Sequence, residues 1–264
     1  MITSRENALI KNILKLHTTA GRKKAGQYFT EGIRSVGQSL KAKAPVDKVI
    51  FSDKVYRTTG GRELMERISQ TGIKAVEISE GLYKSITDTD NPQHIMAVIN
   101  IKEYRLKDIL QSGELLLVIV DGIQDPGNLG TVIRTADAAS AHAVMLLKGT
   151  ADIYNPKTVR STMGSVFGIP VIQVGDNKEL FYWLRETGVR LIASSPEGDI
   201  PYWDIDYRGK IGIIIGNEAN GISEQVKSCS DMSAVLPMPG GAESLNAAVA
   251  CGILLYKALE QRLT

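Results

Sequence analysis

The sequence is poor in the residues that build disulfides and metal sites, with two cysteines and three histidines among 264 residues. Cys229 and Cys251 show neither CxxC spacing nor the Cys/His spacing of a zinc site. The histidines are scattered at His17, His94 and His142. We therefore expect neither a structural disulfide nor a bound metal.

Long apolar runs are also missing. No stretch approaches the roughly 20 residues of a membrane-spanning helix, and the first residues lack the successive charged, apolar and small-residue sections of a signal peptide. No internal repeat or low-complexity tract occurs. The length exceeds the usual domain size of about 100 to 200 residues, and 43% hydrophobic residues suffice for ordinary cores. We expect a cytoplasmic protein of two globular domains that does not contact a membrane.

The formal net charge is only +2, but its distribution is uneven. Up to Lys43 only Glu6 and Glu31 oppose the basic residues, which are Arg5, Lys11, Lys15, Arg22, Lys23, Lys24, Arg34, Lys41 and Lys43. Such a cluster predicts a phosphate-binding surface. The alternative is a solvated amphipathic helix, since apolar residues recur at helical spacing at Leu9, Ile13 and Leu16. Both interpretations are compatible, because the apolar stripe can dock while the lysines face outward.

The chain up to about residue 101 alternates between strand and helix patterns. We expect helices at 31–40 and 61–70, and strands at 46–51, 73–78 and 94–101. This alternation predicts a small α/β domain over residues 1–101. The charged stretch 102–113 is typical of a linker.

The second half shows the same alternation more clearly. Strands are expected at 115–120, 143–147, around 171, around 191, 211–215 and 234–236. Helices are expected at 129–139, 156–163, 178–186 and 244–263. Continuous apolar strands separated by helices predict a parallel sheet covered on both faces, here over residues 114–264.

A nucleotide-dependent dehydrogenase would share this alternation. Its fingerprint, G-x-G-x-x-G after the first strand, is absent from the turn at 121–130. The glycine-bearing loops instead follow the late strands that end near 215 and 236. Ligands of open α/β sheets bind outside the carboxyl ends of strands, so these loops are the expected ligand site.

Three motifs occur in order in this half: DGIQDPGN at 121–128 followed by Arg134, IGNEANGI at 215–222, and PMPGG at 237–241 followed by SLNAAVA at 244–250. Together they resemble the three signatures of the SpoU (TrmH-type) RNA ribose 2'-O-methyltransferases of the SPOUT superfamily. The segment 155–167 also resembles a SpoU stretch with Arg-x-x-Met-Gly. Near the N-terminus, QYFTEG at 27–32 is similar to the L30e-like substrate-binding domain of such enzymes.

The resemblance implies a SPOUT domain with a parallel sheet and a deep trefoil knot, preceded by a smaller L30e-like α/β domain. It also implies S-adenosylmethionine as cofactor, RNA as substrate and a homodimer. The two-domain layout favours 23S-type ribosomal RNA over tRNA. The remaining rivals are a catalytically silent RNA-binding or ribosome-assembly protein and, more remotely, the dehydrogenase.

The resemblance also assigns catalytic positions, which are Asn128, Arg134, Glu218, Ser244 and Asn246. Polar residues at helix starts are equally typical of caps, so Asn128 and Ser244 are also candidates for capping the helices that follow them. An arginine inside a helix is ordinarily solvated. The family assigns Arg134 as the base, but a guanidinium is effectively always protonated. We therefore favour Arg134 as a cation that grips a phosphate and stabilises the forming alkoxide.

The cofactor positions implied by the resemblance are Ala193, Ser194, Gly216, Asn217, Leu236, Met238 and Leu245. Gly216 suits this role because a missing Cβ lets an adenosine approach the backbone. The charge pattern and the SpoU-like stretch together suggest RNA contacts at Arg22, Lys23, Lys24, Arg34, Lys157 and Arg160. Two cations on a helix, such as Lys157 and Arg160, are also commonly just solvated.

Overall fold

The computed structural model describes residues 1–109 and 113–264. They form two compact units, which we call unit 1, residues 1–102 with 152–167, and unit 2, residues 103–151 with 168–264. In these ranges, no helix combines the length and the apolar character that crossing a membrane requires.

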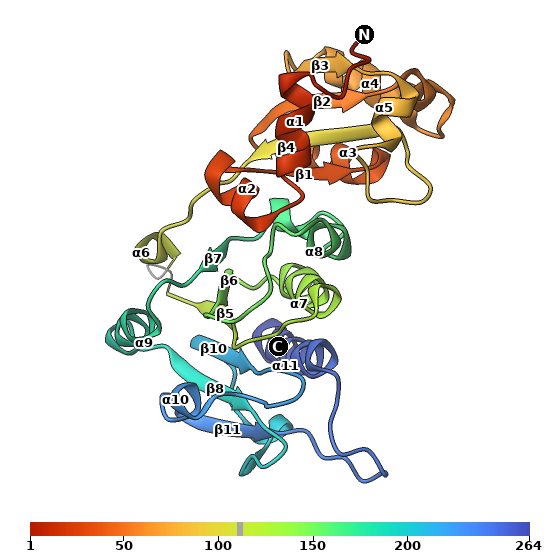
Figure 1. The fold of residues 1–264 in the computed structure, drawn as a ribbon. Helices are drawn as coiled ribbons and strands as arrows, with labels where there is room; N and C mark the ends of the chain where they lie inside the picture. Colours follow the sequence, from red (N-terminus) through yellow and green to blue (C-terminus); the bar gives the residue numbers. More distant parts are fainter. Residues whose placement is uncertain (110–112) are drawn as a thin grey trace. The chain divides into compact units, whose positions relative to one another are not determined.

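Unit 1 is built on a mixed sheet whose described strands lie in the order β1-β4-β2-β3 (Figure 1). Strand β4 is antiparallel to both of its neighbours, and β2 and β3 are parallel. The strands are β1 (Gln27–Glu31), β2 (Val46–Phe51), β3 (Lys74–Glu77) and β4 (Ile95–Asn100). The predicted strand at 46–51 has the observed bounds.

Helices and short 3-10 turns accompany this sheet. They are α1 (Ala8–Lys15), α2 (Thr19–Ala25), α3 (Ile33–Lys41), η1 (Asp53–Arg57), α4 (Gly61–Ser69), α5 (Glu80–Lys84), α8 (Pro156–Ser161) and η2 (Ser165–Phe167). Helix α1 buries Ile10 and Ile13 in a core with Phe29 and Ile50. Its lysines stay exposed. The predicted amphipathic helix near the N-terminus is therefore confirmed.

The segment before α3 differs from the prediction. A helix was expected to begin at Glu31, but Glu31 ends strand β1, and α3 begins at Ile33. The pairing of β1 with β4 joins Gln27 to Asn100 and Glu31 to Met96. Gly32, with a φ of 94°, makes the turn between strand and helix. A backbone angle of this sign favours glycine, which has no Cβ to clash.

Unit 2 contains a parallel sheet whose strands, as far as the structure describes them, follow the order β7-β6-β5-β10-β8-β11-β9. They are β5 (Leu115–Val120), β6 (Ala143–Leu146), β7 (Val171–Gln173), β8 (Arg190–Ser194), β9 (Ile200–Pro201), β10 (Lys210–Ile215) and β11 (Met232–Val235). All six residues of β5 are buried. A strand buried on both faces reads as a continuous apolar run, which explains why β5 was predicted with its observed bounds.

Helices cover both faces of this sheet, on opposite sides of the strands in Figure 1. Helices α9 (Asn177–Glu186) and α10 (Glu224–Lys227) pack against alternate residues of β5, including Leu115, Leu117 and Ile119. Helices α7 (Pro126–Ala138) and α11 (Ala247–Leu263) pack together on the other side. The remaining elements are α6 (Leu106–Ile109) and η3 (Tyr202–Asp204). The predicted α/β class with a covered parallel sheet is confirmed.

The two units differ from the predicted domains in one segment. Residues 152–167 were expected within the second domain, but they pack with unit 1. Asp152 forms an ion pair of 2.6 Å with Arg22, and the rings of Tyr154 and Tyr28 lie 4.6 Å apart. Of the predicted linker 102–113, residues 110–112 lie outside the described residues.

Candidate active site

The carboxyl ends of β8, β10 and β11 lie side by side in the sheet, so their following loops gather at one edge. Together with the start of α11 they enclose a cavity of about 300 Å³. Its lining is Ser194, Ser195, Pro196, Ile215, Gly216, Asn217, Glu218, Ala219, Gly221, Leu236, Met238, Glu243, Ser244, Leu245, Ala247 and Ala250. This is where an open α/β sheet is expected to bind a ligand.

Asn217 fixes the loop that follows β10. Its backbone N–H and C=O both pair with Gly221, at 2.9 Å each. Its side-chain Oδ1 accepts from the N–H groups of Ala219 at 2.8 Å and Asn220 at 3.1 Å. Four hydrogen bonds to one residue hold five residues in a closed turn, which shapes this wall of the cavity before any ligand enters.

The same loop is tied to the turn after β5. Nδ2 of Asn217 donates to the carbonyl oxygen of Gly122 at 2.7 Å. The buried carboxylate of Asp121 accepts from both the N–H and the hydroxyl of Ser223, at 2.8 and 2.7 Å. Residues about 100 positions apart in sequence are thus locked together. Asp121 was not singled out from the sequence, and nothing local to it indicates Ser223 as its partner.

Asn128 joins the three motifs. Its Nδ2 donates to Glu218 Oε1 at 2.7 Å, and its Oδ1 accepts from Asn246 Nδ2 at 3.0 Å. Asn128 does not cap α7, because the cap is Asp125, whose Oδ1 accepts from the Asn128 N–H at 2.8 Å. The Asp-Pro pair before the helix is the usual signal for a cap followed by Pro at the first helical position, and it was missed.

The start of α11 corrects a second expected cap. The helix begins at Ala247 rather than Ser244, and its cap is Asn246, whose Oδ1 accepts from the N–H groups of Ala248 and Val249. Ser244 instead lines the cavity. An amide has both an acceptor and donors, so Asn246 caps its helix and contacts Asn128 at the same time.

Arg134 lies two turns beyond the start of α7, with its side chain exposed. Within the described ranges its guanidinium group makes no hydrogen bond or ion pair, and Arg134 does not line the cavity. The structure therefore brings Asn128, Glu218 and Asn246 into contact, places Ser244 at the cavity wall, and leaves Arg134 outside both groups.

Six of the seven expected cofactor positions line the cavity: Ser194, Gly216, Asn217, Leu236, Met238 and Leu245. Ala193 is buried within β8 and does not. Gly216 is constrained by the protein itself. A Cβ there would lie 2.2 Å from the carbonyl carbon of Gly221. The closed loop therefore requires glycine at this position. This requirement comes from the protein itself, whereas from the sequence the glycine was explained by the space that an adenosine needs.

The lining suits S-adenosylmethionine. Leu236 and Leu245 offer apolar surface to an adenine, and Leu245 is 39% exposed. Glu218 and Glu243 place two carboxylates in the wall, opposite in charge to the sulfonium and ammonium groups of the cofactor. Glu243 is a lining residue that the sequence motifs did not indicate.

The six residues expected to bind RNA all belong to unit 1. Lys23, Lys24, Arg34 and Lys157 are exposed, and Arg160 is half-buried. Arg22 was expected to contact RNA, and the structure contradicts this expectation. Its side chain is 2% exposed and bound to Asp152, so the guanidinium is unavailable to a phosphate.

Comparison with known proteins agrees with this geometry. Residues 115–256 match the model of the SpoU rRNA Methylase family, and residues 7–97 match that of the MRM3-like substrate binding domain. The chain is 36% identical to the 23S rRNA (guanosine(2553)-2'-O)-methyltransferase RlmP of Bacillus subtilis, over 97% of both chains. It is 30% identical to the 23S rRNA (uridine(2479)-2'-O)-methyltransferase of Streptomyces viridochromogenes, over 92% of this chain and 86% of the relative.

Among solved structures, the AdoMet-bound rRNA methyltransferase from Sinorhizobium meliloti is 31% identical, with a TM-score of 0.88. That alignment covers 100% of this chain and 98% of the other. The expected enzyme class, an S-adenosylmethionine-dependent RNA 2'-O-methyltransferase, is confirmed. The chain belongs to the SpoU rRNA methylase family.

Proposed function

We propose that this protein methylates a ribose 2'-hydroxyl of 23S-type ribosomal RNA. The observation that carries the proposal is the pair of hydrogen bonds through which Asn128 joins Glu218 and Asn246 beside the cavity. It unites three motifs that are distant in sequence at the edge of the sheet where ligands bind. The two relatives named for 23S rRNA align with nearly the whole chain, unit 1 included. They differ in the nucleoside modified, so no particular nucleotide is proposed.

In the proposed mechanism, the protein aligns the reacting groups and stabilises charge. Bound S-adenosylmethionine supplies a methyl group that its sulfonium activates. Asn128 and Glu218 shape the pocket for the ribose, with Ser244 and Asn246 at its wall. Arg134 grips the neighbouring phosphate in a forked geometry and stabilises the oxygen as its proton leaves for a phosphate oxygen or water. The exposure of Arg134 and its lack of a partner in the described chain leave its guanidinium available for this contact.

Unit 1 contributes RNA affinity in this proposal. Lys23 and Lys24 on α2, Arg34 on α3 and Lys157 on α8 offer exposed cations to the phosphate backbone. Such contacts release counterions, so we expect RNA affinity to fall steeply with salt.

We further propose that the protein is a cytoplasmic homodimer whose unit 2 contains the trefoil knot of its family. Support for the dimer comes from α11, where Val249, Tyr256 and Leu263 recur every seven residues and are 51%, 53% and 78% exposed. An exposed apolar stripe on one side of a helix is typical of an interface. The cytoplasmic location follows from the ribosomal RNA substrate.

The test is methyl transfer from labelled cofactor to purified RNAs. We expect the protein to methylate a 23S rRNA transcript and not tRNA, and to leave one mapped 2'-O-methyl nucleotide. Asn128→Ala, which keeps the Asp125 cap on α7, is the matched inactive control. Methylation of tRNA alone would refute the rRNA assignment. Binding of RNA without transfer to any RNA, naked or in ribosomal subunits, would favour the silent RNA-binding protein.

A further inference from the structure

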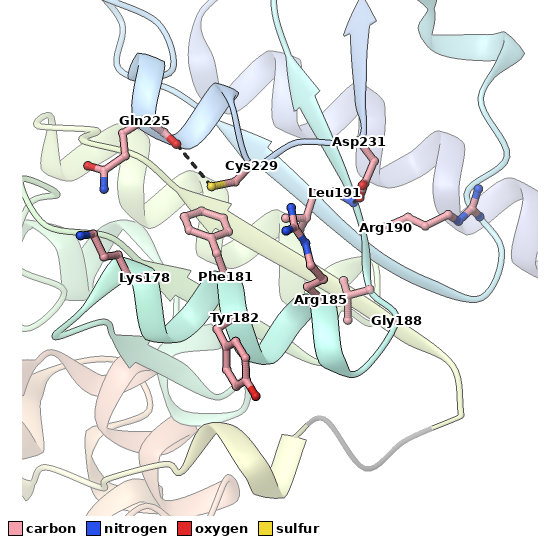
Figure 2. Close-up of a pocket in the computed structure, with 11 residues that line it drawn as sticks. Lys178, Phe181, Tyr182, Arg185, Gly188, Arg190, Leu191, Gln225, Cys229 and Asp231 are labelled. Carbon is pink, nitrogen blue, oxygen red and sulfur yellow. Dashed lines mark hydrogen bonds between the residues drawn. The ribbon is translucent and has the colours of Figure 1, made fainter.

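Unit 2 has a second cavity, of about 480 Å³, away from the site described above (Figure 2). It is formed by α9, by the loop that enters β8, and by the segment from α10 to β11. The first cavity lies where β8 ends, at Ser194, whereas this one lies where β8 begins, at Arg190. The two cavities therefore open at opposite edges of the sheet.

Helix α9 presents a stripe of cation, aromatic ring and cation to this cavity. Lys178, Tyr182 and Arg185 are spaced i, i+4 and i+7, and all three line the cavity. In Figure 2, Lys178 and Arg185 point toward the side of α9 where Cys229 lies, and the Tyr182 ring points away from Cys229. Tyr182 is 58% exposed. In the part of the chain that the structure describes, neither the ammonium group of Lys178 nor the guanidinium group of Arg185 makes a hydrogen bond or an ion pair. Both charges are therefore available to a ligand.

The other charged groups of the cavity are already engaged. Arg190 donates to the carbonyl oxygens of Asp206 and Arg208, at 3.0 and 2.9 Å. The carboxylate of Asp231 accepts from the Leu191 N–H at 2.7 Å. Between these groups the wall is apolar, formed by Phe181, Val189 and Leu191. A fitting ligand is thus an anion with a flat, apolar part.

We propose that this cavity binds an unpaired nucleotide of the substrate RNA. The base stacks on the exposed ring of Tyr182, and the flanking phosphates contact Lys178 and Arg185. Seven residues of helix separate the two cations by about 10 Å along the axis, so they bracket the ring on both sides. Stacking on an aromatic ring accepts any base. The proposal rests on the proposed RNA substrate, and it gives unit 2 an RNA contact beyond the reacting ribose.

The first test compares the kinetics of variants on a 23S rRNA transcript. For Lys178→Ala/Arg185→Ala, we expect KM for RNA to rise at least 5-fold, with kcat and cofactor affinity near wild type. The slope of log affinity against log salt should become shallower by about 1.4, which is two contacts at about 0.7 each for single strands. Arg105→Ala/Arg208→Ala removes two exposed, ion-paired cations of unit 2 outside this cavity and should change neither quantity comparably.

Tyr182 separates stacking from charge. Tyr182→Phe keeps the ring and should retain the wild-type KM, whereas Tyr182→Ala should raise it about 5-fold or more, the lower range for base stacking. If the wild type methylates the transcript but the alanine variants keep its KM and salt slope, the nucleotide site is refuted. An acidic peptide as the true occupant would give that result.

A footprint tests occupancy without relying on methyl transfer. Of the two cysteines, Cys229 lines the cavity (Figure 2), whereas Cys251 is buried and its burial raises the thiol pKa to about 12. Iodoacetamide should therefore label Cys229 selectively. Saturating 23S transcript should slow this labelling in the wild type and not in Lys178→Ala/Arg185→Ala. Equal labelling of free and RNA-bound wild-type protein would overturn the site, even if the enzyme proved inactive on this RNA.

Discussion

Replacing Arg22 by Met should destabilise unit 1 strongly. The guanidinium donates to the carbonyl oxygen of Leu16 at 2.8 Å, to the hydroxyl of Thr19 at 3.0 Å and twice to Asp152, at 2.6 and 3.2 Å. Methionine keeps an unbranched apolar stem but has no donor, so it leaves the largely buried carboxylate of Asp152 without its cation. Breaking a buried ion pair from one side costs about 3 to 5 kcal/mol. We expect a loss of that size in the free energy of unfolding.

Denaturant unfolding followed by circular dichroism measures this loss, and thermal melting should show a drop of about 10 °C. Lys23→Met is the matched control, because Lys23 is exposed on the same helix and should cost no more than about 0.5 kcal/mol. Adding Asp152→Asn to Arg22→Met removes the unpaired charge and should recover part of the loss. If Arg22→Met were as stable as Lys23→Met, the buried pair would not stabilise unit 1.

Four other changes test the active site and unit 1. Arg134→Ala should keep the melting temperature and the cofactor affinity but reduce the rate of single-turnover methyl transfer by several orders of magnitude. Arg134→Lys should restore little of that rate, because an ammonium group lacks the planar fork of a guanidinium. A normal transfer rate in Arg134→Ala would exclude Arg134 as a catalytic group. Gly216→Ala should weaken cofactor binding measured by calorimetry, because the new Cβ would meet the backbone of the loop. Gly240→Ala, where the new Cβ has open space, should bind the cofactor normally. Equal cofactor affinities of the two variants would contradict the role of Gly216. Asn246→Asp keeps the cap acceptor but loses the donor to Asn128, so we expect lower transfer with nearly unchanged stability, and a fully active variant would dismiss that contact. Burial raises the pKa of Glu31, so the folded state binds the carboxyl proton more tightly than the unfolded state does. The stability of the wild type therefore falls as the pH rises through and above the pKa of Glu31 in the unfolded state. Glu31→Gln should gain stability relative to the wild type between pH 4 and 7, and a stability difference that does not change with pH would refute the raised pKa.

Helices and strands are predicted best from the sequence where burial alone determines the residue pattern. Strand β5 is buried on both faces, and its continuous apolar run had no competing interpretation. Strand β1 was missed although its residues were recognised as a motif. It has five residues with polar ends, and it is held by pairing with β4, about 70 residues away. Local pattern carries little information about a strand that depends on such a distant partner.

The partners of a segment are harder to predict than its structure. A helix was expected at 156–163 and α8 is found at Pro156–Ser161, but the packing of this helix in unit 1 was not expected. The alternation of helices and strands assigns residues to elements and leaves open which sheet each element joins. Here the contacts that join the segment to unit 1 include the ion pair of Arg22 with Asp152, two residues 130 positions apart. One consequence is that a fragment beginning near Gly113 would contain 152–167 without the strand and helices against which it packs.

The polar residues at helix starts show why the site was only partly predictable. Asn128 and Ser244 each fitted two roles, capping a helix or forming the site, and propensity cannot separate them. The structure assigns the cap of α7 to Asp125, which frees both ends of the Asn128 amide for Glu218 and Asn246. Asn246 takes both roles, because its oxygen caps α11 while its nitrogen contacts Asn128. The position of the Asn128 side chain therefore depends on how both α7 and α11 begin. A motif within one stretch of sequence does not show that the starts of these two helices are in contact, so it cannot predict this arrangement.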